Sequence, residues 1–123
     1  MEKDNIQFRF DAVAKSKTFR NIVRRFSLDK KAVFDVGCTH GEFLKHFGSG
    51  SVGLTIIPEE AEYGKKIGLD IRAGNIEDQA IAKQFEGLFD VIFANNIFEH
   101  MQSPHLFLER MKMCLKPDGF LTV

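Results

Sequence analysis

A short glycine-containing segment carries the residue pattern with the clearest chemical meaning in this sequence. It reads Asp-Val-Gly-Cys-Thr-His-Gly over residues 35–41 and follows an apolar run. Glycine lets the backbone approach a ligand closely or adopt a positive φ. If a helix follows the turn, the free N–H groups of its first turn attract an anionic group. The segment therefore predicts a ligand-binding turn between a strand and a helix.

The spacing of the two glycines, Gly37 and Gly41, leaves several classes of ligand open. Nucleotide-binding folds of several kinds use a Gly-x-x-x-Gly turn. The Lys-Ser or Lys-Thr ending of a P-loop is missing, which disfavours phosphoryl transfer. The full Gly-x-Gly-x-x-Gly spacing expected for NAD or FAD is missing as well. Taken alone, the turn indicates only a generic ligand-binding junction.

His100 is a candidate general base, because it follows an apolar run and is expected to face the ligand side. The alternative is that Glu99 and His100 form a structural pair that steadies a loop. Cys38 has no evident neighbouring base, so we expect it to act through its backbone only. The histidine and cysteine residues do not cluster at metal-ligand spacing, so we expect no metal site.

The elements that position these residues alternate in type along the chain. Short apolar runs predict buried strands at residues 32–36, 51–57, 69–73, 89–94 and 120–123. Helical spacing and capping residues predict helices at residues 12–27, 42–47, 58–67, 77–86 and 103–115. Such alternation predicts an α/β fold: a doubly wound, mainly parallel sheet with helices on both faces. Ligands of such sheets bind at the carboxyl ends of the strands.

Composition limits the class of protein and its partners. The chain has 123 residues, of which 44% are hydrophobic, enough for one compact domain with a core. Lys plus Arg and Asp plus Glu number 17 each, so no net field favours nucleic acid or an acidic membrane. No apolar run has signal-peptide or membrane-spanning length. With two cysteines and no CxxC pair, these features predict a cytoplasmic protein.

Several segments in order resemble the class I S-adenosylmethionine-dependent methyltransferases. Residues 34–41 resemble the first motif of that family, usually Asp-x-Gly-x-Gly-x-Gly. Later segments resemble the end of the second strand, the adenine loop, the fourth strand and the turn into the fifth: 52–60, 73–77, 89–101 and 115–121. The resemblance implies the sheet order 3-2-1-4-5. It covers residues 30–123, where it implies an incomplete, Rossmann-like cofactor domain, and the helical spacing before it places an N-terminal helical segment at 1–29.

The resemblance implies two groups of residues that contact S-adenosylmethionine. Those near its methionine part would be Asp35, Gly37, Cys38, Thr39, Gly41, Ala94 and Asn95. Those near its ribose or adenine would be Thr55, Ile56, Asn75 and Ile76. Asp35 would orient the turn and the amino group of the cofactor. Asn75 would be a hydrogen-bond partner of the adenine and Ile76 its apolar neighbour, and the acceptor of the methyl group would be a small molecule.

The sequence departs from the family at the end of the second strand. The family usually has an acidic residue there, whose carboxylate accepts both ribose hydroxyls; this chain has Thr55. Ile57 stands where a capping serine is usual, so a helix cap is lost too. Glu59 or Glu60 could substitute, although both also suit a helix N-terminus. We expect cofactor binding to be weaker than the family norm by about 1–2 kcal/mol.

The sequence ends inside the predicted fifth strand, before the antiparallel hairpin that closes the sheet of the family. We expect either a fragment, or a second copy or partner chain over the exposed edge. Three functions stay open. The first is methyl transfer to a small molecule. The second is a degenerate or truncated module that acts in structure or protein interaction. The third, another Rossmann-like binder such as an oxidoreductase, is disfavoured by the segments at 89–101 and 115–121.

Overall fold

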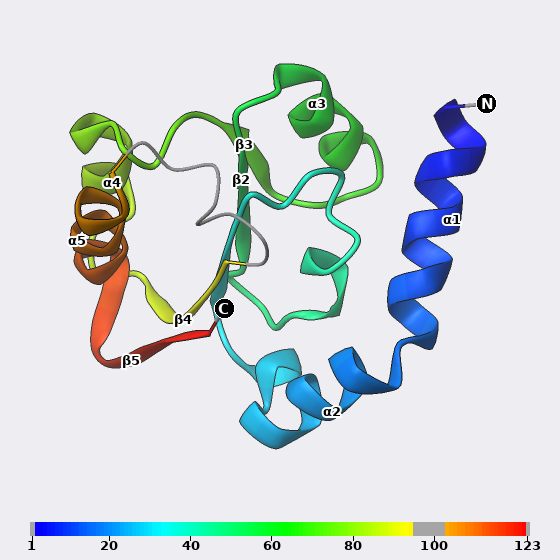
Figure 1. Cartoon of the computed structure of the whole chain (residues 1–123), viewed down its shortest axis with the longest axis horizontal. Helices are drawn as coiled ribbons and strands as arrows, with labels where there is room; N and C mark the ends of the chain where they lie inside the picture. Colours follow the sequence, from blue (N-terminus) through cyan, green and yellow to red (C-terminus); the bar gives the residue numbers. More distant parts are fainter. Residues whose placement is uncertain (1, 95–102, 123) are drawn as a thin grey trace.

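A five-stranded parallel sheet forms the centre of the protein. The computed structural model describes residues 2–94 and 103–122, the first three of them as backbone only. The strand order is β3-β2-β1-β4-β5, and every neighbouring pair is parallel (Figure 1). The strands are β1 (Val33–Val36), β2 (Val52–Thr55), β3 (Ile71–Ala73), β4 (Phe89–Phe93) and β5 (Leu115–Thr122). The predicted fold class and strand order are confirmed.

Helices cover both faces of this sheet, as the alternation of elements predicts. They are α1 (Glu2–Lys15), α2 (Lys17–Phe26), α3 (Pro58–Lys66), α4 (Gln79–Gln84) and α5 (Pro104–Cys114). Figure 1 shows α4 and α5 together on one side of the sheet and α1, α2 and α3 on the other. None of the helices within the described ranges combines the length and apolarity that crossing a membrane requires.

The N-terminal region is more helical than its sequence pattern predicts. The sequence pattern predicts one helix at 12–27, whereas the structure has two helices that meet at Ser16. Ser16 caps α2, since its Oγ accepts the N–H of Phe19 at 3.2 Å. Its extended backbone, with ψ 115°, ends the preceding helix. Helix α1 is held by the buried side chains of Ile6, Phe10 and Val13.

The helix predicted at residues 42–47 is not formed. The chain makes turns and a short 3-10 helix, Leu44–His46, instead. The N–H of Gly48 donates to the carbonyl oxygens of Leu28 and Lys31, at 3.0 and 3.1 Å. These bonds hold the chain next to the residues that precede β1 after a single helical turn. A longer helix at 42–47 would break them, so the local helical spacing does not produce a helix here.

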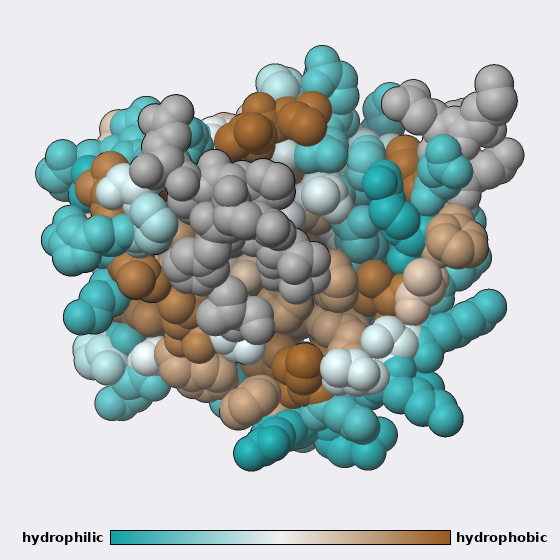
Figure 2. Space-filling view, viewed as in Figure 1, coloured by the Kyte–Doolittle hydropathy of each residue, from teal (hydrophilic) through white to brown (hydrophobic). Residues whose placement is uncertain are grey.

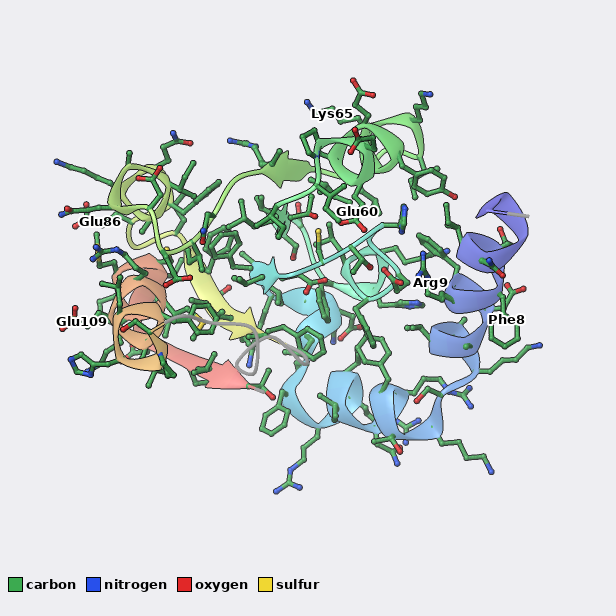
Figure 3. The ribbon with its side chains drawn as sticks, turned by 45° about the horizontal axis from the view of Figure 1, so that its top comes forward. Phe8, Arg9, Glu60, Lys65, Glu86 and Glu109 are labelled. Carbon is green, nitrogen blue, oxygen red and sulfur yellow. The ribbon has the colours of Figure 1, made fainter. Side chains whose placement is uncertain are left out.

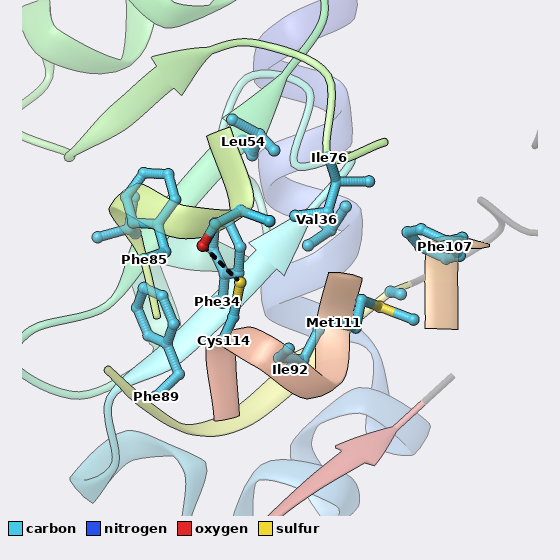
Figure 4. Packing of buried hydrophobic residues seen from close by; sticks show 13 residues of the cluster. Phe34, Val36, Leu54, Ile76, Phe85, Phe89, Ile92, Phe107, Met111 and Cys114 are labelled. Carbon is cyan, nitrogen blue, oxygen red and sulfur yellow. Dashed lines mark hydrogen bonds between the residues drawn. The ribbon is translucent and has the colours of Figure 1, made fainter. Parts of the chain in front are cut away.

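Side chains that alternate along the strands divide the core into layers. Phe34, Val36 and Ile92 face α4 and α5, where they pack with Phe107 and Met111 (Figure 4). The opposite layer contains Val13, Phe19, Leu28, Val33, Val91 and Phe93. A third, smaller cluster under α3 contains Cys38, Leu44, Ala61 and Ile71. Residues from before β1 thus belong to the same core as the strands.

The segment at 115–121, which resembles the turn into the fifth strand, lies within β5, and this strand begins at Leu115 rather than Phe120. The pairing with β4 shifts there, from Phe89 opposite Leu115 to Val91 opposite Phe120. The turn residues therefore form an irregularity in the edge strand. Nζ of Lys116 lies 3.2 Å from Oδ1 of Asp90, an ion pair that holds the irregular segment to β4.

Candidate cofactor-binding site

The predicted site residues come together at the carboxyl edge of the sheet. Because the strands are parallel, their last residues lie side by side, with Val36 opposite Leu54 and Thr55 opposite Ala73. This edge holds the described residues of the predicted site: Asp35, Gly37, Cys38, Thr39, Gly41, Thr55, Ile56, Asn75, Ile76 and Ala94. Asn95 and His100, the candidate general base, lie outside the described residues.

The glycine turn is closed by backbone conformations that favour glycine. Gly37 has φ 79° and Gly41 has φ 93°, and Thr39 between them has φ 50°. The N–H groups of Gly37 and Cys38 donate to the carbonyl oxygen of Leu54, at 2.8 and 3.1 Å. A left-handed conformation costs a residue such as threonine about 1–2 kcal/mol. The turn therefore folds back onto β2, with Gly37 and Thr39 exposed above the sheet.

Gly53 of β2 makes room for the turn, a role that the sequence did not reveal. A Cβ at this position would lie 2.6 Å from Sγ of Cys38, whose side chain is 1% exposed. Burial raises the pKa of the Cys38 thiol far above its ordinary value, and the negative charges of Asp35, Glu60 and Glu42 add to the shift. The thiol stays protonated, which supports the prediction that Cys38 takes part through its backbone.

Glu42 is a buried carboxylate that organises the turn and was missed in the sequence. Its Oε1 accepts hydrogen bonds from the hydroxyl of Thr39 and from the N–H of His40, the latter at 3.2 Å. Its Oε2 lies 3.5 Å from Nε of Arg9 in α1. The available signal was the spacing Thr39-x-x-Glu42, which is the pattern of a helix capping box. Here the same pattern stabilises a turn instead of a helix.

Helix α1 reaches the site through one of its faces. Figure 3 shows the side chain of Arg9 pointing toward the centre of the molecule and that of Phe8 pointing away. Nη2 of Arg9 lies 3.0 Å from Nδ1 of His40. The rings of His40 and Phe10 both contact Tyr63 of α3, with centroid distances of 5.2 and 6.3 Å. Segments far apart in the sequence therefore meet around the turn.

Asp35 places an unpaired carboxylate oxygen beneath the turn. Its side chain is 2% exposed, and its Oδ2 has no hydrogen-bond partner among the described residues. Burial raises the pKa of Asp35 well above its ordinary value, and the nearby charge of Glu42 raises it further. An unpaired buried oxygen is costly unless something donates to it. The site therefore has a free acceptor suited to a cationic or hydrogen-bond-donating group of a ligand.

The end of β2 presents an apolar side chain beside a buried polar one. Ile56 is 74% exposed, and Figure 2 shows hydrophobic surface at the upper rim, where β2 leads toward α3 in Figure 1. Thr55 is 4% exposed. Its hydroxyl donates to Oε1 of Glu60 and accepts the N–H of Ile57 at 3.1 Å. Thr55 is therefore engaged with its own chain, whereas Ile56 is free for an apolar contact.

The loop after β3 exposes one of the two predicted adenine contacts. Asn75 is exposed, and its Oδ1 accepts the N–H of Glu77 at 3.0 Å. Ile76 is 2% exposed and packs in the core layer with Ala82 and Phe85. A contact of Ile76 with adenine would therefore have to use its backbone. The predicted roles of both residues stay predictions.

A separate cavity lies away from this edge. It has a volume of about 560 Å³ and is formed between α5 and β5 by largely apolar side chains. The lining includes Leu108, Met111, Phe120 and Leu121. Of the predicted cofactor contacts that the structure describes, none lines this cavity.

Comparisons with known proteins agree on one family. The family model described as a methyltransferase domain matches residues 9–123. The ubiquinone biosynthesis O-methyltransferase of Actinobacillus pleuropneumoniae serotype 5b is 32% identical over 102 residues, which cover 74% of this chain and 44% of that protein. The 2-methyl-6-phytyl-1,4-hydroquinone methyltransferase of a Synechocystis species is 31% identical over 97 residues, which cover 74% of this chain and 30% of that protein. The chain spans less than half the length of these relatives.

Solved structures agree with the observed fold. The crystal structure of coclaurine N-methyltransferase, bound to N-methylheliamine and S-adenosylhomocysteine, matches with a TM-score of 0.71 at 20% identity. The match covers 85% of this chain and 33% of the other. At this identity the likeness shows the fold alone. The chain therefore belongs to the methyltransferase domain family and has the fold of the class I S-adenosylmethionine-dependent methyltransferases.

Proposed function

We propose that this chain is the cofactor-binding part of an S-adenosylmethionine-dependent methyltransferase that acts on a small molecule. The observation that carries the proposal is the unpaired Oδ2 of Asp35 beneath a turn that Gly37 and Gly41 close with positive φ. The methionine part of the cofactor carries an ammonium group, which suits that carboxylate oxygen. The names of the two relatives, an O-methyltransferase of ubiquinone biosynthesis and a hydroquinone methyltransferase, support a small-molecule acceptor.

The residues present fit the two halves of the cofactor. The exposed turn residues Gly37 and Thr39 would hold the methionine part, and the fully buried Ala94 would form a small floor beneath it. Ile56 would pack on the adenosine, and the exposed Asn75 would hydrogen-bond to the adenine. The cofactor supplies an electrophilic methyl group, whose transfer requires alignment with the acceptor. The proposal also includes two residues outside the described part of the chain, Asn95 as a further cofactor contact and His100 as the general base.

A second candidate is a module of the same fold with weak or no catalysis, which acts in structure or protein interaction. The observation that favours it is Thr55, because its hydroxyl is engaged with Glu60 and Ile57 at the point where the family has a carboxylate.

Three further expectations stay predictions. They are the cytoplasmic location, the division at residue 29, and a second copy or partner chain at the β5 edge.

Calorimetric titration with S-adenosylmethionine and S-adenosylhomocysteine tests the proposal. We expect the wild type to bind both and Gly37→Val to lose binding, because valine is strained at φ 79° and crowds the ligand. Gly68→Val is the matched control, since Gly68 has φ 85° and open space around its Cβ position, at the end of α3. It should keep its affinity. A folded wild type that binds neither ligand would contradict the cofactor proposal.

A further inference from the structure

Glu60 places a carboxylate at the end of β2 although it belongs to α3. It is the third residue of that helix, which begins at Pro58. Figure 3 shows Glu60 on the side of α3 that faces the strands, whereas Lys65 lies on the opposite side. The hydroxyl of Thr55, the last residue of β2, donates to Oε1 of Glu60. This bond fixes the carboxylate at the carboxyl edge of the sheet.

Thr55 has no hydrogen left to offer a ligand. A threonine hydroxyl has a single hydrogen, and Thr55 gives it to Glu60. The same oxygen accepts the N–H of Ile57 at 3.1 Å, and the side chain is 4% exposed. The second carboxylate oxygen of Glu60, by contrast, makes no hydrogen bond to the residues that the structure describes. The free acceptor at this point of the edge therefore belongs to Glu60.

The surroundings of Glu60 indicate which part of a ligand it would meet. Its charge contributes to the raised pKa of the Cys38 thiol, so the carboxylate lies near the glycine turn as well as near β2. Ile56, beside it, presents a side chain that is 74% exposed. A carboxylate next to an apolar surface suits a sugar with neighbouring hydroxyls joined to a flat base. In α/β nucleotide-binding folds an acidic side chain beyond the first βα turn accepts ribose hydroxyls in this way.

We propose that Glu60 binds the ribose hydroxyls of the adenosyl group, with Thr55 as the positioning residue that holds the carboxylate. The inference rests on the proposed function, because it takes the ligand to be an adenosyl compound. In the rest of the family a carboxylate at the end of β2 usually accepts the ribose hydroxyls. In this chain, Glu60 in the first turn of α3 would accept them instead. The ribose contact is then charge-assisted in spite of the threonine at the strand end.

The competing role of Glu60 is purely structural. A glutamate at the third position of a helix commonly accepts the N–H of the capping residue. Here the N–H of Ile57 donates to the hydroxyl oxygen of Thr55 instead, and the same hydroxyl donates its hydrogen to Glu60. A residue that only stabilises the helix would affect folding, and it would affect ligands with and without ribose hydroxyls alike. The experiment therefore has to compare two such ligands.

The test measures, by calorimetry, the affinity of the whole chain for S-adenosylhomocysteine and for its analogue without the ribose hydroxyls. We expect Glu60→Gln to weaken binding of S-adenosylhomocysteine about tenfold or more, since hydrogen bonds to charged groups are the stronger class. Binding of the analogue should change less than about threefold, because the lost bonds are absent from it. Equal losses for the two ligands would assign Glu60 to helix stability and overturn the inference.

Two control variants test whether the effect depends on the position of the carboxylate rather than on charge in the first turn of α3 alone. Glu59→Gln removes a neighbouring first-turn charge that is exposed, and it should leave both affinities within about twofold. Adding Thr55→Asp to Glu60→Gln returns a carboxylate to the strand and should restore much of the affinity for S-adenosylhomocysteine. Failure of this rescue, with both proteins folded, would count against a ribose role.

Two further outcomes keep the inference distinct from the function on which it rests. If the wild type binds neither ligand, the proposed function fails and the inference fails with it. If the wild type binds and Glu60→Gln binds equally well, only the inference fails. Should Glu60→Gln not fold, Thr55→Val removes the positioning hydroxyl and should narrow the difference in affinity between the two ligands. An unchanged difference in that variant would overturn the inference.

Discussion

Nε of Arg9 lies 3.5 Å from Oε2 of Glu42, and this ion pair joins the N-terminal helix to the glycine turn at the edge of the sheet. The side chain of Glu42 is 6% exposed and that of Arg9 is 49% exposed. Glu42 also accepts hydrogen bonds from Thr39 and His40 within the turn. The same carboxylate therefore shapes the turn and holds α1 against it.

Replacing Arg9 with alanine should loosen this attachment. We expect Arg9→Ala to lower the free energy of unfolding by about 1 kcal/mol, because a buried carboxylate loses its cationic neighbour while the arginine itself is half exposed. Urea denaturation measures the change. Arg72→Ala is the matched control, because it removes an exposed ion pair: the side chain of Arg72 is 51% exposed and that of its partner Asp70 is 47% exposed. This variant should lower the free energy of unfolding by less than about 0.5 kcal/mol. Equal effects of the two variants would contradict the proposed importance of the Arg9–Glu42 pair.

The buried Asp35 should make stability depend on pH. Burial and the charge of Glu42 raise the pKa of Asp35 in the folded state, whereas an unfolded aspartate titrates near about 3.9. The contribution of protonated Asp35 to the free energy of unfolding is therefore fully present below about pH 4, and it is lost as the pH rises through the pKa of the folded state.

Asp35→Asn should remove this dependence. Relative to the variant, the wild type should lose at most about 1.4 kcal/mol of stability for each pH unit above about pH 4, up to its folded pKa. Urea denaturation of both proteins between about pH 4 and pH 8 measures the difference. A difference that stays constant with pH would show that Asp35 is ionised in both states.

The contact between Gly53 and Cys38 predicts an overpacking effect that a second substitution relieves. A Cβ at Gly53 would lie 2.6 Å from Sγ of Cys38. Gly53→Ala should therefore destabilise the protein by about 1–3 kcal/mol, and displacement of the turn should weaken binding of S-adenosylhomocysteine. Thermal or urea unfolding measures the first effect and calorimetry the second.

Removal of the thiol provides the control for this prediction. In the double variant Gly53→Ala with Cys38→Ala, the added methyl group occupies space that Sγ has left, so part of the lost stability should return. A double-mutant cycle isolates this coupling from the separate cost of each substitution. Strictly additive effects would mean that the strain at Gly53 arises elsewhere.

Local patterns in the sequence were sufficient for much of the fold. Ser103 and Pro104 predicted the start of a helix, and the structure has Oγ of Ser103 accepting the N–H of Leu106 at 3.3 Å. The apolar runs predicted the strands, although β5 begins at Leu115 and not at Phe120. The spacing of the buried Ile6, Phe10 and Val13 also fits one face of a helix, which is the face that α1 packs against the core.

Residues 42–47 show where a local pattern was insufficient. Their apolar spacing indicated a helix, but the bonds of Gly48 to Leu28 and Lys31 require the chain to turn back after one short 3-10 helix. Both partners precede β1 and are distant from this segment in the sequence. The sequence of residues 42–47 cannot indicate this turn, because the carbonyl oxygens that accept the N–H of Gly48 belong to another part of the fold.

The order of apolar runs in the sequence is sufficient to predict which residues stand at the ends of the strands. Apolar runs define the strands, and parallel strands bring their carboxyl ends to one edge, so Asp35, Thr55 and Ala94 had to lie near one another. Which side chains form contacts at that edge depends on how the helices pack. The contacts of Glu42 with Arg9 and of Glu60 with Thr55 depend on how α1 and α3 pack on the sheet, and that packing is set by contacts between distant segments.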